Sequence, residues 1–327
     1  RTGTLEANPG CGPEQAFRGQ RQNATSLLSQ WNPAMIRPRR SVLFMPGSNA
    51  RAIDKARNLP ADGVILDLED SVAPDAKPMA REQIAAAVAA GGFGRREIII
   101  RINNLESPWW QDDLAMAAAA RPHGILVPKI ARPGDIRTLE ERLRALHADP
   151  AIVLWAMIES PLGVLSAQEI AATAREGDKR LAGFIIGPND IARETRMRML
   201  PGRAAMLPLF SHCILAARAY GIEILDGPYN DISDIAGFAK ECAQGRDMGF
   251  DGKTLIHPGQ IDAANAAYTP AAEDVARARK IMGVFDLPEN VSKGVVQLDG
   301  QMVERLHVEM AKRTIAIADA IAALKAG

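Results

Sequence analysis

Residues 64–70 read Val-Ile-Leu-Asp-Leu-Glu-Asp, a short apolar run with β-branched side chains that ends in a cluster of acidic ones. A continuous apolar run of this length is typical of a strand that is buried on both faces. Similar runs recur along the chain, and the expected strands span residues 42–45, 64–68, 97–102, 124–130, 152–158, 181–186, 221–225 and 253–256.

Segments of helical length separate these runs, for example at 81–90, 114–120, 139–147, 167–175 and 209–220. Regular alternation of strand and helix predicts parallel strands joined by helical crossovers. Eight such units over about 220 residues match a barrel, whereas a doubly wound open sheet more often has roughly five to seven strands. We therefore predict an α/β fold, a (β/α)8 TIM barrel, with the open sheet as the alternative.

The chain divides into three predicted parts: a polar N-terminal arm at 1–38, the barrel at 39–270 and a C-terminal helical extension or lid at 271–327. The first 40 residues carry six Arg against Glu6 and Glu14, a bias found in mitochondrial transit peptides, although Pro and Gly would interrupt a helix there. Three cysteines without CxxC spacing indicate neither a disulfide framework nor a zinc site. We expect a cytoplasmic protein, with the mitochondrial matrix as the alternative.

The overall charge and hydropathy exclude two kinds of partner. Lys and Arg number 39 and Asp and Glu number 39, so the chain lacks the basic field that drives nucleic-acid binding. Its longest apolar runs are far shorter than the roughly 20 residues that cross a bilayer. We expect neither a nucleic-acid partner nor a membrane span.

Polar side chains follow the ends of the expected strands, where the loops of a barrel gather catalytic groups. They are Asp67, Glu69, Asp70, Arg101, Asn103, Lys129, Glu159, Asn189, Asp190, Asp226 and His257. Confining so many carboxylates is unfavourable unless protons or a cation offset them. Oxygen ligands of this kind suit Mg2+ and also Mn2+, and Arg101 could meet an anionic oxygen of a substrate or enolate.

Several common catalytic templates do not occur in the sequence. There is no GxSxG elbow, GxxxxGK[ST] loop, HExxH helix or GxGxxG fingerprint. Lys129 follows an expected strand, which leaves a Schiff-base aldolase open as a minor alternative.

Six ordered motifs resemble the citrate lyase β-subunit-like CoA-ester lyases of the HpcH/HpaI aldolase superfamily, and among them the malyl-CoA and citramalyl-CoA lyases. The motifs are Arg40-Ser41-Val42-Leu43-Phe44-Met45-Pro46-Gly47-Ser48, Asp67-Leu68-Glu69-Asp70-Ser71-Val72-Ala73-Pro74, Arg101-Ile102-Asn103, Ala156-Met157-Ile158-Glu159-Ser160-Pro161-Leu162-Gly163, Gly187-Pro188-Asn189-Asp190, and Gly252-Lys253-Thr254-Leu255-Ile256-His257-Pro258. The resemblance implies that Glu159 and Asp190 hold Mg2+ and that Arg101 is catalytic and faces the substrate oxygens.

The same resemblance assigns the binding of coenzyme A. Phe44 and Lys55 would contact the CoA portion of the substrate, with Arg40 as a further candidate. The chain departs from the lyase pattern at Asn49, where these lyases tend to carry an Arg, and Arg51 could take its place.

In the lyases, a C-terminal Gly-x-Met-Ile/Val-Asp motif lies on a lid that closes over a neighbouring subunit and supplies the acid/base. The chain has Glu304 where that Asp is expected. The resemblance implies an enzyme that cleaves or forms a 3-hydroxyacyl-CoA such as malyl-CoA or citramalyl-CoA, with a 2-oxo acid and an acyl-CoA as the other reactants. It also implies that this enzyme is a homo-oligomer, a trimer or hexamer. Because Glu304 could direct water to the thioester instead, a (3S)-malyl-CoA thioesterase is the alternative, and a catalytically silent binding protein is a remote one.

Overall fold

The computed structural model describes residues 36–325. They form two compact units, one of Pro38–Thr269 with residues 320–325 and one of Pro270–Asp319 with residues 36–37. We call them the barrel unit and the C-terminal unit. The predicted arm at 1–38 lies outside the described residues except for its last three positions. Within 36–325, no helix is both long enough and apolar enough to cross a membrane.

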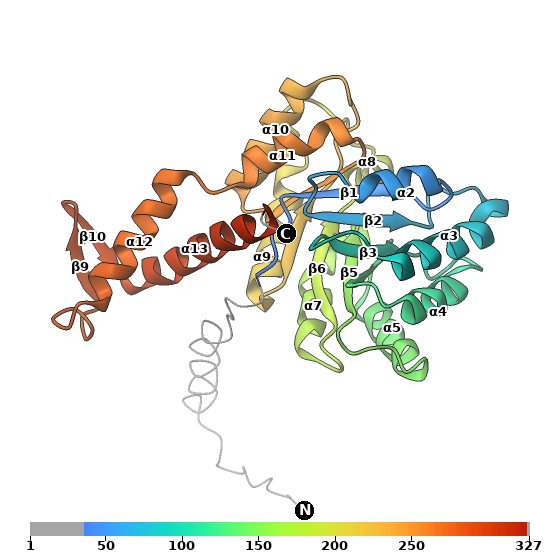
Figure 1. The fold of residues 1–327 in the computed structure, drawn as a ribbon, viewed down its shortest axis with the longest axis horizontal. Coiled ribbons are helices and arrows are strands. Elements are labelled where there is room, and N and C mark those ends of the chain that lie inside the picture. The colour runs from blue at the N-terminus through green and yellow to red at the C-terminus, as the bar shows by residue number, and fades with distance from the viewer. Residues whose placement is uncertain (1–35, 326–327) are drawn as a thin grey trace, which may run out of the picture. The chain divides into compact units, whose positions relative to one another are not determined.

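The barrel unit is a closed ring of parallel strands, which confirms the predicted fold (Figure 1). Each strand pairs with the next, and β1 also pairs with β8 to close the ring. The strands are β1 (Ser41–Pro46), β2 (Gly63–Asp67), β3 (Glu97–Arg101), β4 (Gly124–Val127), β5 (Val153–Ile158), β6 (Leu181–Ile186), β7 (Glu223–Asp226) and β8 (Gly252–Leu255).

Helices follow the strands and cover the outside of the ring. They are α2 (Ala50–Ala56), α3 (Lys77–Ala90), α4 (Trp110–Ala120), α5 (Pro133–Ala145), α6 (Pro161–Leu165), α7 (Ala167–Ala172), α8 (Pro188–Thr195), α9 (Leu207–Tyr220), α10 (Ile235–Met248) and α11 (Ile261–Tyr268). Short 3-10 helices occur at Pro74–Ala76, Thr173–Arg175 and Pro258–Gln260.

Alternate residues along β1–β7 belong to two separate cores. Ile99 of β3 packs inside the barrel, while its neighbours Ile98 and Ile100 pack against the helices. The inner core consists of Val42, Ile65, Ile99, Leu126, Trp155, Met157, Ile185 and Leu225. This alternation follows from the two-residue period of a strand, and it decides which strand-end side chains enter the mouth of the barrel.

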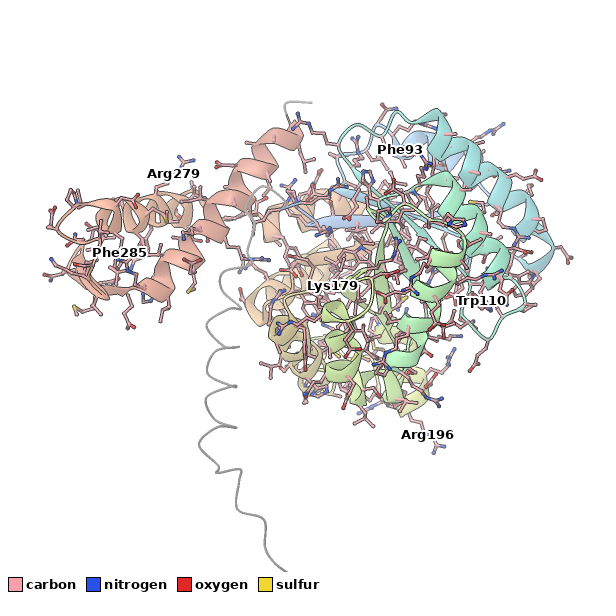
Figure 2. The ribbon with its side chains drawn as sticks, turned by 90° about the horizontal axis from the view of Figure 1, so that it is seen from below. Phe93, Trp110, Lys179, Arg196, Arg279 and Phe285 are labelled. Atoms are coloured by element: carbon pink, nitrogen blue, oxygen red, sulfur yellow. The ribbon has the colours of Figure 1, made fainter. Side chains whose placement is uncertain are left out.

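The C-terminal unit has its own small core. It contains α12 (Ala272–Asp286), an antiparallel hairpin of β9 (Val295–Leu298) and β10 (Gln301–Glu304), and the start of α13 (Arg305–Lys325). Phe285, labelled in Figure 2, packs in this core, whose other buried members are Ala278, Ile281, Val296, Val303, Val308 and Ala311. The second strand of the hairpin was not predicted from the sequence, because Gln301–Glu304 lacks a continuous apolar run.

Candidate active site at the carboxyl end of the barrel

Four side chains enter the mouth of the barrel because of strand periodicity. Phe44, Asp67, Arg101 and Glu159 each lie two residues beyond an inward-facing member of the inner core, respectively Val42, Ile65, Ile99 and Met157. The two-residue period therefore turns them inward at the carboxyl ends of their strands. Together with Glu69 and Asp190 we call this group the rim.

Arg101 is clamped in one orientation. Asp67 accepts from its Nε at 2.6 Å and from its Nη2 at 2.7 Å, a bidentate pair. Its Nη1 lies 3.0 Å from a carboxylate oxygen of Glu69, and its guanidinium lies 4.7 Å from the ring centre of Phe44. Asp67 is itself held by the backbone N–H of Glu69 at 2.9 Å and by Ser71.

The electrostatics of this pair keep both partners charged. Burial acts to raise the pKa of Asp67, but the charge and hydrogen bonds of Arg101 outweigh it and lower the pKa below its ordinary value. Burial acts to lower the pKa of Arg101, and Asp67 and Glu69 raise it above its ordinary value. The site therefore contains a permanent, oriented cation.

Glu69 lies in a different environment from Asp67, although it also pairs with Arg101. Burial, with smaller contributions from the charges of Asp70 and Asp67, raises its pKa to about 7, although the positive charge of Arg101 acts to lower it. The side chain is about 7% exposed. Because its pKa lies near neutrality, this carboxyl group can hold or release a proton in the range in which enzymes operate.

Glu159 is the most perturbed carboxyl group of the rim. Burial first, and then the negative charges of Glu69 and Asp190, together raise its pKa to about 8. Its Oε1 accepts the backbone N–H of Lys129 at 2.8 Å, and Lys129 adopts a left-handed backbone with φ of 55° to donate it. A Cβ on Gly187 would lie 2.4 Å from the Cβ of Glu159, so only glycine leaves room for this carboxylate.

Asp190 lies in the first turn of α8, directly after the Gly187-Pro188 turn that ends β6. Its Oδ1 accepts from Arg193 at 2.7 Å, and Arg193 is largely exposed. Among residues 36–325, no set of three or more His, Cys, Asp or Glu side chains is placed to hold a metal by itself. Two carboxylates with water and substrate oxygens suit Mg2+, and a bound cation would offset the burial and the neighbouring negative charges that raise the pKa of Glu159.

The other predicted site residues are not all brought to this mouth. Lys55 is exposed on α2, whose N-cap is Asn49, so Asn49 acts as a helix cap. Arg40 precedes β1 at the opposite end of the barrel, where it is buried and forms a bidentate pair with Asp62. Arg40 therefore lies away from the mouth of the barrel. Glu304 is exposed at the end of β10 in the C-terminal unit.

Asp226 also follows a strand, but it does not join the rim. Its neighbour Leu225 faces the inner core, so Asp226 turns outward toward the helices. There it is buried and pairs with Arg203 at 2.8 Å and Lys253 at 2.8 Å. Its pKa is lowered because these cations outweigh the effect of burial. The expectation that Asp226 belongs to the mouth was wrong, because strand parity directs it to the other face.

Sequence reasoning missed three supporting contacts of the site. These are the clamp of Asp67 on Arg101, the backbone N–H of Lys129 on Glu159, and the space that Gly187 leaves. Strand parity could have found the first, since Asp67 and Arg101 are register partners on neighbouring strands. Backbone contacts such as that of Lys129 leave no signal in side-chain patterns.

Catalytic groups of (β/α)8 enzymes come from the carboxyl ends of several strands, as Asp67, Arg101 and Glu159 do here, so fold and site together define a barrel enzyme. The chain belongs to the HpcH/HpaI aldolase/citrate lyase family, whose model matches residues 40–258. This confirms the family inferred from the motifs.

Relatives in this family carry two kinds of name. A (3S)-malyl-CoA thioesterase of Cereibacter sphaeroides strain KD131 is 44% identical over 88% of this chain and 98% of its own length. The citrate lyase subunit beta of Escherichia coli K12 is 34% identical over 86% of this chain and 94% of its own length. CitE of Mycobacterium tuberculosis, solved with magnesium, acetoacetate and coenzyme A, is 27% identical over 85% of this chain and 97% of that one, with a TM-score of 0.66.

Proposed function

We propose that the protein is a Mg2+-dependent thioesterase that hydrolyses a 3-hydroxyacyl-CoA with a second carboxylate, of which (3S)-malyl-CoA is the type. The main support for a metal-dependent acyl-CoA site is that the buried carboxylate of Glu159 lies near Asp190 and near Arg101, which Asp67 holds in place. The malyl-CoA thioesterase that is 44% identical over nearly its full length favours hydrolysis over carbon–carbon cleavage. Sequence motifs alone favoured cleavage, so the order of the two candidates is reversed.

Glu159 and Asp190 would hold the metal, Mg2+ first and Mn2+ as a substitute. When bound, the ion would neutralise the buried carboxylates and polarise an oxygen of the substrate. CitE was solved with magnesium and coenzyme A, which supports a bound magnesium ion and a CoA substrate for this chain. Arg101, oriented by Asp67, would bind a carboxylate or carbonyl oxygen of the acyl group.

Phe44 and Lys55 would contact the CoA portion of the substrate. The ring of Phe44 already supports Arg101, so any CoA contact would use its other face. Lys55 is exposed on α2 together with Arg51, and both could pair with phosphates. Arg51 lies two residues after Asn49, which the N-terminus of α2 uses as its cap.

Glu304 would act as the base in hydrolysis. It would take a proton from water as the water oxygen attacks the thioester carbon, after which the carbon–sulfur bond breaks and the CoA thiolate receives a proton. The products are malate and free coenzyme A. Within residues 36–325 the Glu304 carboxylate forms no hydrogen bond or ion pair, so it is not committed to another role.

The second candidate is a CoA-ester lyase, which the citrate lyase beta relatives support. In that reaction the substrate hydroxyl loses a proton, the carbon–carbon bond breaks, and a 2-oxo acid such as glyoxylate leaves the enolate of an acyl-CoA. Arg101 would stabilise the enolate oxygen, and Glu304 would supply its proton. Two further expectations stay predictions. The protein is expected to form a homo-oligomer, a trimer or hexamer, and to be located in the cytoplasm or the mitochondrial matrix.

One experiment separates these candidates. The protein is incubated with (3S)-malyl-CoA and Mg2+, and free thiol and glyoxylate are followed together. We expect free coenzyme A and malate without glyoxylate. Acetyl-CoA and glyoxylate without free thiol would instead establish the lyase. Neither product, together with binding of Mg2+ or substrate, would establish the remote alternative of a silent binding protein. The Glu159→Gln variant is the control for metal dependence, and it should lose turnover in either reaction.

A further inference from the structure

The junction of β10 and α13 holds Glu304 in an unusual way. Glu304 directly precedes the first residue of α13 and therefore occupies its N-cap position. A carboxylate at an N-cap commonly accepts from backbone N–H groups of the first turn. In the described part of the chain the Glu304 carboxylate accepts no such bond, and instead its own backbone N–H donates to Nδ1 of His307 at 2.9 Å.

His307 is the third residue of α13, so this contact is the return half of a capping box. Glu or Gln usually fills that position, and here the imidazole nitrogen of His307 accepts the backbone N–H of Glu304 in the same way. Because Nδ1 accepts a hydrogen bond, the proton of the neutral ring lies on Nε2. His307 therefore fixes the Glu304 backbone, while the other half of the box, a bond from the backbone N–H of His307 to the Glu304 carboxylate, is not formed among the described residues.

The backbone on either side of Glu304 is also fixed. Glu304 is paired with Val295 across the hairpin, and the preceding Val303 is buried in the core of the C-terminal unit. On the other side, the backbone N–H of Arg305 donates to Gly294 at 3.1 Å, and its guanidinium lies 5.0 Å from the ring centre of Phe285. Rotation about the Glu304 side chain is the main freedom that remains.

We propose that His307 is a positioning residue for the Glu304 carboxylate, because its bond to the Glu304 backbone N–H fixes the main chain from which that carboxylate projects for proton transfer. The inference rests on the proposed function, in which Glu304 is the base. His307 itself touches no substrate in this proposal. Its acceptor nitrogen fixes the backbone from which the carboxylate projects.

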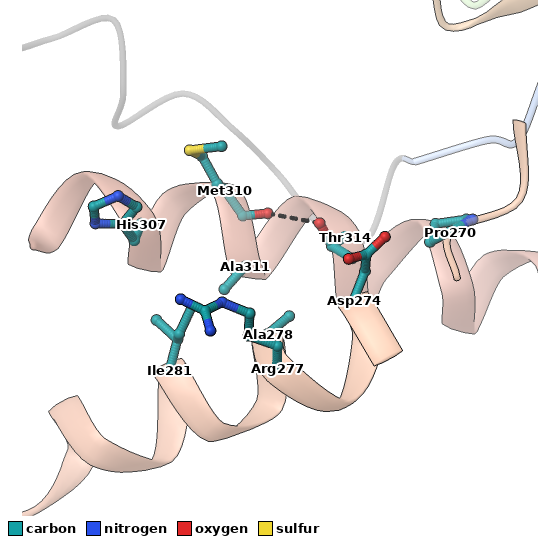
Figure 3. A pocket seen from close by; sticks show the side chains of 9 residues that line it. All are labelled: Pro270, Asp274, Arg277, Ala278, Ile281, His307, Met310, Ala311 and Thr314. Atoms are coloured by element: carbon teal, nitrogen blue, oxygen red, sulfur yellow. Dashed lines mark hydrogen bonds between the residues drawn. The ribbon is translucent and has the colours of Figure 1, made fainter. Parts of the chain in front are cut away.

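The surroundings of His307 leave its acceptor nitrogen without a rival donor. His307 lines a cleft of about 290 Å3 between α12 and α13, which Figure 3 shows from close by. The charged residues of the facing helix in that cleft are Asp274 and Arg277, and Arg277 donates to Gln301 at 2.6 Å. In the region that the structure describes, neither is bonded to His307.

The test compares two substitutions at one position. His307→Gln keeps an acceptor at the third helical residue, and His307→Leu removes it. We expect kcat for hydrolysis of (3S)-malyl-CoA to fall on the order of 10- to 100-fold in His307→Leu, since misplacing a catalytic group by about 1 Å has effects of that size. KM should change little, and His307→Gln should restore kcat to within about threefold of the wild type, because Gln also completes a capping box.

A matched control separates positioning from loss of structure. Asn290 lies in the same unit, where it donates to Val284 at 2.8 Å and makes no bond to Glu304. Asn290→Ala should weaken this unit without lowering kcat. An equal loss of kcat in Asn290→Ala and His307→Leu would overturn the inference, as would an equal loss in His307→Gln and His307→Leu.

Glu304→Gln distinguishes failure of this inference from failure of the proposed function. If Glu304→Gln loses turnover while His307→Leu keeps it, the inference alone is overturned. Full turnover in Glu304→Gln would overturn the assignment of the base and the inference with it. If His307 acts through Glu304, the double variant is no slower than Glu304→Gln alone, and a multiplicative loss would show an independent role.

Discussion

Replacing Glu159 by Gln should make the metal-free protein more stable at pH 8, although it removes a buried residue of the site. The amide keeps an oxygen that can accept the N–H of Lys129, which Glu159 now accepts at 2.8 Å. It removes only the charge, which burial and the neighbouring carboxylates disfavour. If replacing a buried carboxylate stabilises the protein, that carboxylate serves to bind a ligand and does not stabilise the fold.

The size and pH dependence follow from the pKa. It rises from 4.5 to about 8 on folding, so between these values the folded protein binds more protons than the unfolded chain. Stability contributed by this group therefore falls as pH rises through that window. At about 1.4 kcal/mol for each pKa unit, the charged side chain destabilises the fold by up to about 4 kcal/mol at pH 8. The gain in Glu159→Gln should be close to zero at pH 4.5 and should grow with pH.

The measurement is urea or thermal unfolding in EDTA at several pH values, repeated with Mg2+. Mg2+ should stabilise the wild type and leave Glu159→Gln unchanged. Asp67→Asn is the matched control, because Asp67 is equally buried but its pKa is lowered by Arg101. The charged Asp67 stabilises the fold at any pH above its ordinary pKa. We therefore expect Asp67→Asn to lower the free energy of unfolding by about 3–5 kcal/mol at pH 8. Destabilisation of Glu159→Gln at pH 8 would refute the reasoning.

Two further predictions concern the neighbours of the carboxylates. Gly187→Ala should displace Glu159, because the new Cβ would lie 2.4 Å from the Cβ of Glu159. Calorimetry should then show that the affinity for Mg2+ is reduced by about 10- to 100-fold. Unchanged affinity would show that Glu159 is not a ligand. Arg193→Ala should strengthen Mg2+ binding by up to about fivefold, because it frees Asp190 from an exposed pair at 2.7 Å; weaker binding would mean that Arg193 orients Asp190 instead.

Much of the barrel could be predicted because each strand is a local pattern. The apolar run that ends at Asp67 is enough to predict a buried strand without knowledge of the rest of the chain. The expected strands coincide with β1–β8 to within a few residues. The hairpin strand Gln301–Glu304 was not predicted because its apolar residues, Met302 and Val303, are only two and are flanked by polar ones. Its partner Val295–Leu298 and the buried Val303 stabilise it through contacts that only the folded unit makes.

The candidate site was predictable as a set of residues but not as an arrangement. Asp67 and Asp226 look alike in sequence, since each ends an apolar strand in an acidic residue. The structure separates them, because Asp67 turns into the mouth and clamps Arg101, while Asp226 turns outward to Arg203. Arg40 likewise begins a motif of the family but lies at the far end of its strand.

The sequence by itself determined the alternation of strands and helices, the family, and the identity of the polar side chains that follow the strands. These properties depend on neighbours in the chain, and local periodicity records them. Only the tertiary structure decided which of those side chains share a space and what their charges are. Both carboxyl groups are buried, but burial and two neighbouring carboxylates raise the pKa of Glu159, whereas the guanidinium of Arg101 outweighs burial and lowers the pKa of Asp67. Effects of this kind depend on distance and burial in the folded chain rather than on order along the sequence.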